Sequence, residues 1–238
     1  RAGTARLRAG VDYLKTRSDG GAWSAAALFF SDGTPARMPR SYSAGARWNR
    51  WDRESTNAFA VVEQSLPGGW TGRAAYNHRA TDTDSVRLAG PNSSSADPVT
   101  GLGINIVDTY SVSETREHSF DLYASGPFAM FGREHELVVG ANRYDRDLAT
   151  IRAAITSRPY TLVGGFPSVF EWDGDIGRPT TVNHGVPSSV ANTVETGYYA
   201  AARFNPSDRS KVIAGARYTD WAAETATFDV EGRFTGRT

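Results

Sequence analysis

The residue types that perform chemistry in proteins are few and widely separated in this chain. The sequence has no cysteine, which excludes thiolate nucleophiles, thiolate metal ligands and disulfides. It has no Gly-x-Ser-x-Gly motif, and no glycine-rich loop leads into a predicted helix. The four histidines lack the His-x-x-x-His spacing that would place two of them on one metal: His78, His118, His135 and His184. We therefore expect no catalytic residue, no resident metal and no cofactor.

Two further groups are better explained as loop features than as sites. The carboxylates of Glu171, Asp173 and Asp175 are of the type that Ca²⁺ prefers, but a solvated surface loop explains them better. Four glycines are expected to supply positive φ angles in loops: Gly101, Gly103, Gly164 and Gly165.

Aromatic side chains are the residues best suited to bind a ligand, because they give a large contact area at a low rotamer cost. Many of them lie between the predicted strands, and Tyr42, Tyr110, Tyr160 and Phe170 belong to this wider group. The candidate ligand-binding residues are Trp23, Phe29, Phe30, Trp48, Trp51, Phe166 and Trp172. The alternative role for each is to pack loops together or to line the outer surface. Trp48 and Trp51 are three apart, so on a regular strand they face opposite ways.

The elements that carry these residues are predicted to be β-strands. Three stretches place an apolar residue at every second position around a glycine: 7–13, 137–142 and 212–218. Successive side chains of a strand point to opposite faces, so each stretch has one apolar and one polar face. We expect Leu7, Val11, Leu137, Val139, Val212 and Ala216 to face lipid. We expect Arg8, Asp12, Asn142 and Arg217 to face a watery lumen.

The pattern predicts seven strands that alternate between short turns and long connections. The strands are expected near 4–16, 48–65, 70–79, 115–125, 134–147, 194–204 and 211–219. Short turns are expected at 66–69, 126–133 and 205–210, flanked by a girdle of Trp70, Phe128, Phe131 and Phe204. The other connections are predicted to run to roughly 30 to 46 residues, which is unusual in a compact soluble domain. Short periplasmic turns and long extracellular loops are typical of outer-membrane barrels.

Composition agrees with this class. Basic and acidic residues balance at 26 each, so nothing indicates a nucleic-acid partner. The mean hydropathy is −0.44 and no apolar run approaches the length of a membrane-spanning helix. The chain opens at Arg1 in strand pattern without a visible secretory signal, and it closes in polar sequence. We expect it to be an internal piece of a longer protein.

Several segments resemble the barrel of TonB-dependent ferric-siderophore receptors, in the subgroup for pyoverdine, ferrioxamine and coprogen-type hydroxamates. They are Leu28–Gly33, Pro39–Tyr42, Arg47–Asp52, Asp121–Phe128, Phe131–Ala141 and Asp173–Ile176. The resemblance implies a 22-stranded antiparallel transmembrane β-barrel in the outer-membrane lipid, closed by an N-terminal plug and coupled to the TonB complex. Residues 1–238 would then be a partial barrel domain that lacks the plug and the C-terminal strands.

A ferric siderophore carries its iron already coordinated, so its receptor needs aromatic surface and hydrogen bonds rather than metal ligands. The parent protein is therefore expected to take up a ferric siderophore through TonB, whereas this segment alone should not transport. Two alternatives remain open. One is a small outer-membrane barrel or adhesin, which would need an even number of strands. The other is a soluble all-β carbohydrate-binding module, in which a second sheet would cover the Leu7 face.

Overall fold

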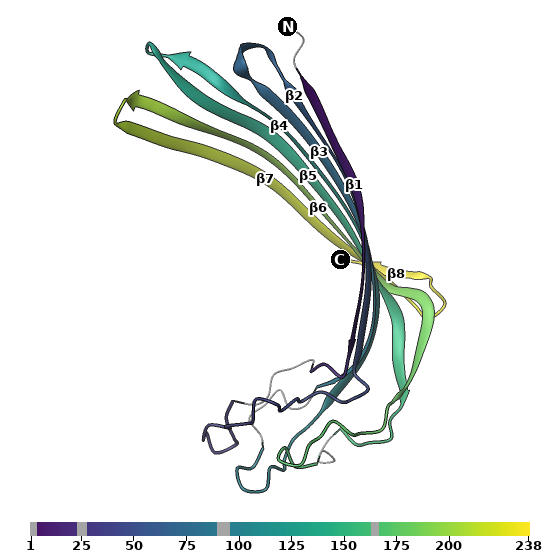
Figure 1. The fold of residues 1–238 in the computed structure, drawn as a ribbon. Coiled ribbons are helices and arrows are strands. Elements are labelled where there is room, and N and C mark those ends of the chain that lie inside the picture. Colours follow the sequence, from purple (N-terminus) through teal and green to yellow (C-terminus); the bar gives the residue numbers. More distant parts are fainter. Residues whose placement is uncertain (1–3, 23–27, 90–95, 163–166) are drawn as a thin grey trace.

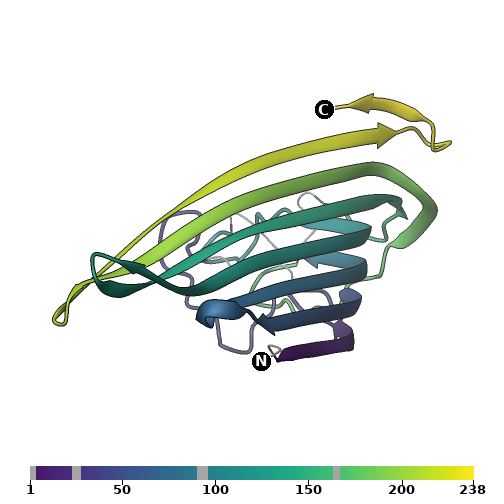
Figure 2. The same cartoon turned by 90° about the horizontal axis from the view of Figure 1, so that it is seen from above.

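The chain forms one antiparallel sheet of eight strands in the order of the sequence (Figures 1 and 2). The structure is a computed structural model that describes residues 4–22, 28–89, 96–162 and 167–238. The strands are β1 (Ala5–Asp19), β2 (Arg50–Ser65), β3 (Thr71–Ala89), β4 (Val107–Met130), β5 (Arg133–Ser157), β6 (Thr180–Ser207), β7 (Ser210–Phe228) and β8 (Phe234–Arg237). A short 3₁₀ turn, η1 (Pro67–Gly69), joins β2 to β3. No helix within the described ranges has the length and apolarity needed to cross a bilayer.

The seven predicted strands are present. The sheet has an eighth strand in addition, and several strands are longer than predicted. The prediction missed β8, whose four residues after a turn at Gly232 are too few to show an alternating pattern. β3, β4, β5 and β6 extend well beyond their predicted ends. Two connections are consequently shorter than expected, at 90–106 and 158–179, while the connection 20–49 has the predicted span. Outside the apolar band the strands are polar on both faces, so alternation does not mark where they end.

The predicted division into two faces is confirmed by the strand register. Directly opposed residues of antiparallel strands lie on the same face of the sheet. One row is apolar from β1 to β7: Leu7, Val62, Ala74, Leu122, Ala141, Tyr198 and Tyr218. The adjacent row lies on the other face and is largely polar: Arg8, Val61, Ala75, Asp121, Asn142, Gly197 and Thr219. All the residues predicted for each face lie on one common side.

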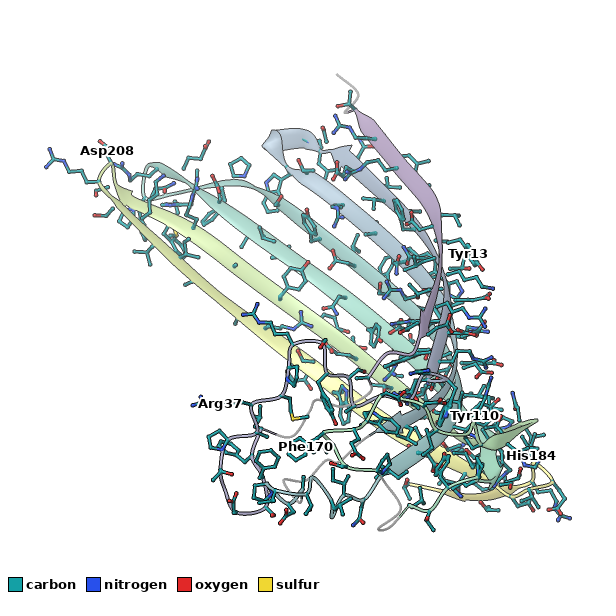
Figure 3. All side chains as sticks on the ribbon, turned by 60° about the horizontal axis from the view of Figure 1, so that its bottom comes forward. Tyr13, Arg37, Tyr110, Phe170, His184 and Asp208 are labelled. Carbon is teal, nitrogen blue, oxygen red and sulfur yellow. The ribbon has the colours of Figure 1, made fainter. Side chains whose placement is uncertain are left out.

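The apolar face is uncovered, as a lipid-facing surface would be. The side chains of Leu7 and Val11 are 69% and 72% exposed. No second sheet covers them among the residues that the structure describes, although the soluble-module alternative requires one. Figure 3 shows Tyr13, on the same face, pointing away from the loops. The structure therefore favours a membrane sheet over a soluble sandwich.

The apolar face ends in aromatic side chains at its tight-turn end. The rings of Phe128, His135 and Phe204 lie 5.2 to 6.1 Å apart from centre to centre. Trp70 packs directly over Gly126, where a Cβ atom would lie 2.5 Å from the indole. Gly126 is thus required for close approach inside β4, and only the last part of the turn predicted at 126–133 forms the reversal. The β4–β5 reversal occurs at Phe131 and Gly132, both with positive φ.

At its other limit, the apolar band gives way to histidines and then to charge. His78 and His118 oppose each other across β3 and β4, with ring centres 4.5 Å apart, and the Tyr76 hydroxyl lies 2.8 Å from His118 Nδ1. His118 lies well inside β4, because β4 begins at Val107, eight residues before its predicted start at 115. Further along this face come ion pairs that suit water, such as Arg50–Asp84 at 2.9 Å and Arg116–Asp82 at 2.8 Å.

Candidate functional site

The three longer connections gather at the end of the sheet opposite the tight turns (Figures 1 and 3). Backbone hydrogen bonds join them to one another. Ser31 N–H donates to the Ala96 carbonyl at 2.9 Å, and Val169 N–H donates to the Gly101 carbonyl at 3.1 Å. Arg47 N–H donates to the Gly174 carbonyl at 2.8 Å. Segments far apart in sequence are therefore held as one unit.

This unit has its own hydrophobic core. Its buried members are Ala46, Leu88, Ala96, Ile104, Ile106, Val169 and Trp172. They come from all three connections and from the end of β3, so the core attaches the loops to the sheet. Phe30, Met38, Tyr42 and Trp48 pack against it from the connection 20–49. We refer to this assembly as the loop cluster.

Buried polar contacts fix the loop cluster at defined points on the sheet. Asn49 is 2% exposed, and its side-chain amide bonds both backbone groups of Leu88, at 2.7 and 2.9 Å. Arg158 makes two hydrogen bonds to the Asp108 carboxylate, at 2.6 and 2.8 Å. The Tyr160 hydroxyl adds a third at 2.7 Å. Paired donors on one carboxylate hold geometry more firmly than a single contact does.

A cavity of about 820 Å³ opens within the loop cluster. Its wall combines apolar side chains, Phe30, Met38, Tyr42 and Phe170, with polar ones that include Arg37 and Arg47. The rings of Phe30 and Phe170 are 5.9 Å apart and tilted by 58°. Figure 3 shows Arg37 and Phe170 on these loops, far from Asp208 in the β6–β7 turn. Concave, mainly apolar sites with a few polar groups are typical of small-molecule binding.

The polar groups near the cavity are ordered by local bonds. Asp97 accepts from the Thr100 backbone N–H at 2.7 Å, its hydroxyl at 2.9 Å and the Val99 N–H at 2.9 Å. These bonds hold the pKa of Asp97 below its ordinary value. Burial raises the pKa of the Tyr42 phenol, so this cavity-lining hydroxyl stays protonated at neutral pH.

The acidic loop that contains Asp173 and Asp175 faces an arginine of the same chain, Arg47. Arg47 donates to the Asp173 carboxylate at 2.6 Å and lies 4.0 Å from Asp175. No group of three or more potential metal ligands occurs among the described residues. The acidic residues of this loop thus join two connections by ion pairs.

The predicted ligand-binding residues are placed in different environments. Phe30 and Trp172 line the cavity, but Trp172 is only 8% exposed and belongs mostly to the core of the loop cluster. Trp48 packs against that core. Trp51 lies on β2 with the Arg87 guanidinium 4.5 Å above its ring, and Phe29 is 49% exposed and not part of the cavity wall. Trp23 and Phe166 lie outside the described residues.

Sequence reasoning missed the non-aromatic part of the wall. Met38 and Arg37 line the cavity beside Phe30, and Val169 forms part of its floor. Nothing in the alternation or in the turn signals distinguishes these residues from others in the same connections. Tyr42 and Phe170 also line the cavity, and their aromatic side chains had placed them in the wider group of residues suited to bind a ligand.

The burial of Trp172 gives a testable consequence for loop order. Truncating a buried tryptophan to alanine costs about 3–5 kcal/mol of local packing. We expect Trp172→Ala in the full-length protein to accelerate protease cleavage within 158–179 on intact cells. Trp51→Ala serves as the control, because Trp51 is 47% exposed and lies outside the loop core. Equal cleavage rates in the two variants would show that Trp172 does not hold the loops together.

The chain belongs to the TonB dependent receptor-like, beta-barrel family, whose family model matches residues 2–238. This is a family of outer-membrane receptors and not a class of enzymes. The chain is accordingly a segment of an outer-membrane β-barrel.

Individual relatives support the same assignment. The ferripyoverdine receptor of Pseudomonas aeruginosa is 30% identical over 237 residues, which cover 96% of this chain and 28% of that receptor. The ferric-pyoverdine BN7/BN8 receptor of Pseudomonas putida is 28% identical over 222 residues, covering 92% of this chain and 27% of that receptor. The chain thus spans less than a third of the length of these relatives.

A solved structure confirms the architecture. The crystal structure of the ferripyoverdine receptor of the outer membrane of Pseudomonas aeruginosa bound to ferripyoverdine superimposes with a TM-score of 0.73 at 28% identity. The match covers 94% of this chain and 30% of that one. The sheet described above therefore corresponds to part of a larger barrel wall.

Proposed function

We propose that the protein containing this chain is an outer-membrane receptor that takes up a ferric siderophore, energised through TonB. The observation that supports this most directly is the cavity of about 820 Å³ in the loop cluster, on the side expected to face the cell exterior. Relatives named as ferripyoverdine receptors share this chain's sequence at 28–30% identity. A pyoverdine-type chelate is the siderophore class that these names favour.

The chemistry of the cavity fits a bulky chelate whose iron is already coordinated. Phe30 and Phe170 offer ring faces, and Tyr42 and Arg37 offer hydrogen-bond donors. The receptor would contribute contact surface and donors, and the iron would arrive as part of the substrate. We propose Phe30, Tyr42 and Phe170 as contact residues, with Trp172 supporting the wall from behind.

We propose that transport also requires parts of the protein that lie outside residues 1–238. We propose that residues 1–238 act as one section of the barrel wall, with a plug and further strands elsewhere in the protein. Contact with the TonB complex is proposed to occur through a region N-terminal to this section. The lipid-facing row described above anchors the section in the membrane.

The test uses the full-length gene in a Gram-negative strain that lacks its own siderophore receptors. We expect cells expressing it to accumulate radiolabelled iron supplied as ferripyoverdine, and to lose this ability when TonB is deleted. Surface binding should persist without TonB. Cells that neither bind nor accumulate ferripyoverdine, or any ferric hydroxamate tested beside it, would refute the proposal.

A further inference from the structure

Two histidines that are far apart in the sequence lie side by side on the apolar face of the sheet. His78 of β3 and His118 of β4 are directly opposed in the strand register. Their ring centres are 4.5 Å apart, and the ring planes are tilted by 34°. Directly opposed side chains leave the same face of a sheet, so the two rings can present nitrogens to one common ligand. We call these residues the histidine pair.

One hydrogen bond fixes the orientation of the pair. The Tyr76 hydroxyl, on the same face of β3, lies 2.8 Å from His118 Nδ1, which leaves Nε2 of that ring to bind a ligand. Histidines that bind a metal typically hold their other ring nitrogen in a hydrogen bond of this kind. His78 Nδ1 is buried and has no hydrogen-bond partner in the described part of the chain. A buried nitrogen of this kind calls for a bound water or ion.

The histidine pair lies at the edge of the apolar band, where charged groups begin. In the neighbouring row position on β5, Asp145 directly opposes His118 and accepts two hydrogen bonds from Arg143, at 2.8 and 3.0 Å. Further along the same face, Arg116 contacts Asp82 at 2.8 Å. Charged groups are costly in hydrocarbon, so this level of the face lies among lipid headgroups and water. A hydrated ion can therefore reach the pair.

The strands around the histidine pair all belong to this chain. β3 and β4 are interior strands of the sheet, with β2 on one side and β5 on the other. The side chain of His118 is exposed, and the small residues Ala58 and Ala80 are neighbours of His78 on the same face. The pair is thus formed by the sheet itself and does not depend on parts of the barrel outside residues 1–238.

We propose that the histidine pair binds a divalent transition-metal ion such as Zn²⁺ or Cu²⁺. Imidazole nitrogens suit these ions, and metal–nitrogen bonds of about 2.0–2.1 Å require two rings to lie as close together as these do. The protein supplies two ligands and water completes the coordination, since no group of three or more potential ligands occurs among the described residues. The sequence lacks a His-x-x-x-His spacing, but here the strand register brings the rings together.

The proposed ion joins β3 to β4 on the apolar face and is separate from the siderophore site. Neither histidine lines the cavity in the loop cluster. The inference goes beyond the proposed uptake function and does not depend on it.

The experiment uses the full-length protein in detergent, with Zn²⁺ as the probe in a buffer that does not chelate metals. Titration calorimetry gives the number of bound ions and their affinity. We expect His118→Ala and His78→Ala each to lose one bound Zn²⁺ per molecule. Tyr76→Phe should weaken the binding of this ion about tenfold or more, because it removes the hydrogen bond that orients His118.

The matched control is His184→Ala. His184 is exposed on β6, away from the pair, and its loss should leave the count and the affinity unchanged. Any other metal sites of the full-length protein contribute equally to all variants and cancel in the comparison. Equal Zn²⁺ counts and affinities in the unaltered protein and in both variants of the pair would overturn the proposal, and the histidines would then only border the apolar band.

Bound Cu²⁺ gives a second measurement, on the unaltered protein, that does not require a folded variant. Electron paramagnetic resonance detects the nitrogens that coordinate Cu²⁺. We expect one equivalent of Cu²⁺ to show coupling to two imidazole nitrogens, and an excess of Zn²⁺ to displace it. A spectrum without imidazole coupling would overturn the proposal.

Discussion

Replacing Phe170 by alanine in the full-length receptor is expected to weaken ferric-siderophore binding about tenfold or more, which corresponds to at least ~1.4 kcal/mol. Phe170 lines the loop cavity and keeps 52% of its surface exposed, and its ring lies 5.9 Å from that of Phe30 at a tilt of 58°. Its ring is thus available to a ligand and contributes little to the buried core. Aromatic anchors inside concave sites commonly dominate binding energy.

The matched control is Phe29→Ala. Phe29 has nearly the same exposure, at 49%, and lies next to Phe30, but it does not line the cavity. Its loss should leave affinity within about twofold of the unaltered receptor, as expected for residues outside an energetic hot spot. Affinity is measured by titrating ferripyoverdine against quenching of the intrinsic fluorescence. A larger effect from Phe29 than from Phe170 would place the ligand outside the cavity.

Strand identity was readable from the sequence because one face is apolar and the other polar. The row from Leu7 to Tyr218 alternates with the row from Arg8 to Thr219, and a shift of one residue would put every side chain on the wrong face. Hence all seven predicted strands were found. Val139 and Asn142 lie on opposite faces of β5, as predicted.

Strand ends were not readable, because their cause is not alternation. Beyond the bilayer both faces meet water or loops, so β4 and β6 continue through polar residues with no apolar period. Val86 and Leu88 lie on the apolar side of β3 and are fully buried, and Leu88 belongs to the core of the loop cluster. Only the tertiary packing of distant connections explains the burial of Leu88 in that core.

The residue types that line the loop cavity were predictable in part, but their positions were not. Many aromatic residues lie in the connections, and of the candidate ligand-binding residues Phe30 and Trp172 line the cavity. Trp172 and Trp48 were chosen for the same reason, but the loop cluster needs a hydrophobic core and uses them for it. Local sequence does not distinguish an aromatic ring that faces a cavity from one that packs beneath it. Contacts between distant connections, such as the ion pair of Arg47 and Asp173, determine which rings face the cavity and which pack beneath it.

Replacing Val139 by arginine is expected to lower the free energy of unfolding of the barrel in lipid by about 2–4 kcal/mol. Val139 lies on the apolar face between Ala124 and Ala200, well inside the band bounded by the Phe128 girdle and the His78–His118 pair. A guanidinium at this depth must be buried in hydrocarbon or drawn toward a distant interface. Either arrangement destabilises the folded state.

Val138→Arg is the control at the neighbouring position. Val138 lies on the lumen face among Ser125 and Ala201, whose small side chains leave room for an arginine in contact with water. The free energy of unfolding of the full-length protein is measured with urea in phospholipid vesicles. It should fall by about 2–4 kcal/mol in the Val139→Arg variant and by less than about 1 kcal/mol in the Val138→Arg variant, since lumen substitutions avoid the hydrocarbon. If both variants unfold at the same urea concentration, or if the Val138→Arg variant is the less stable of the two, the assignment of the lipid and lumen faces is wrong.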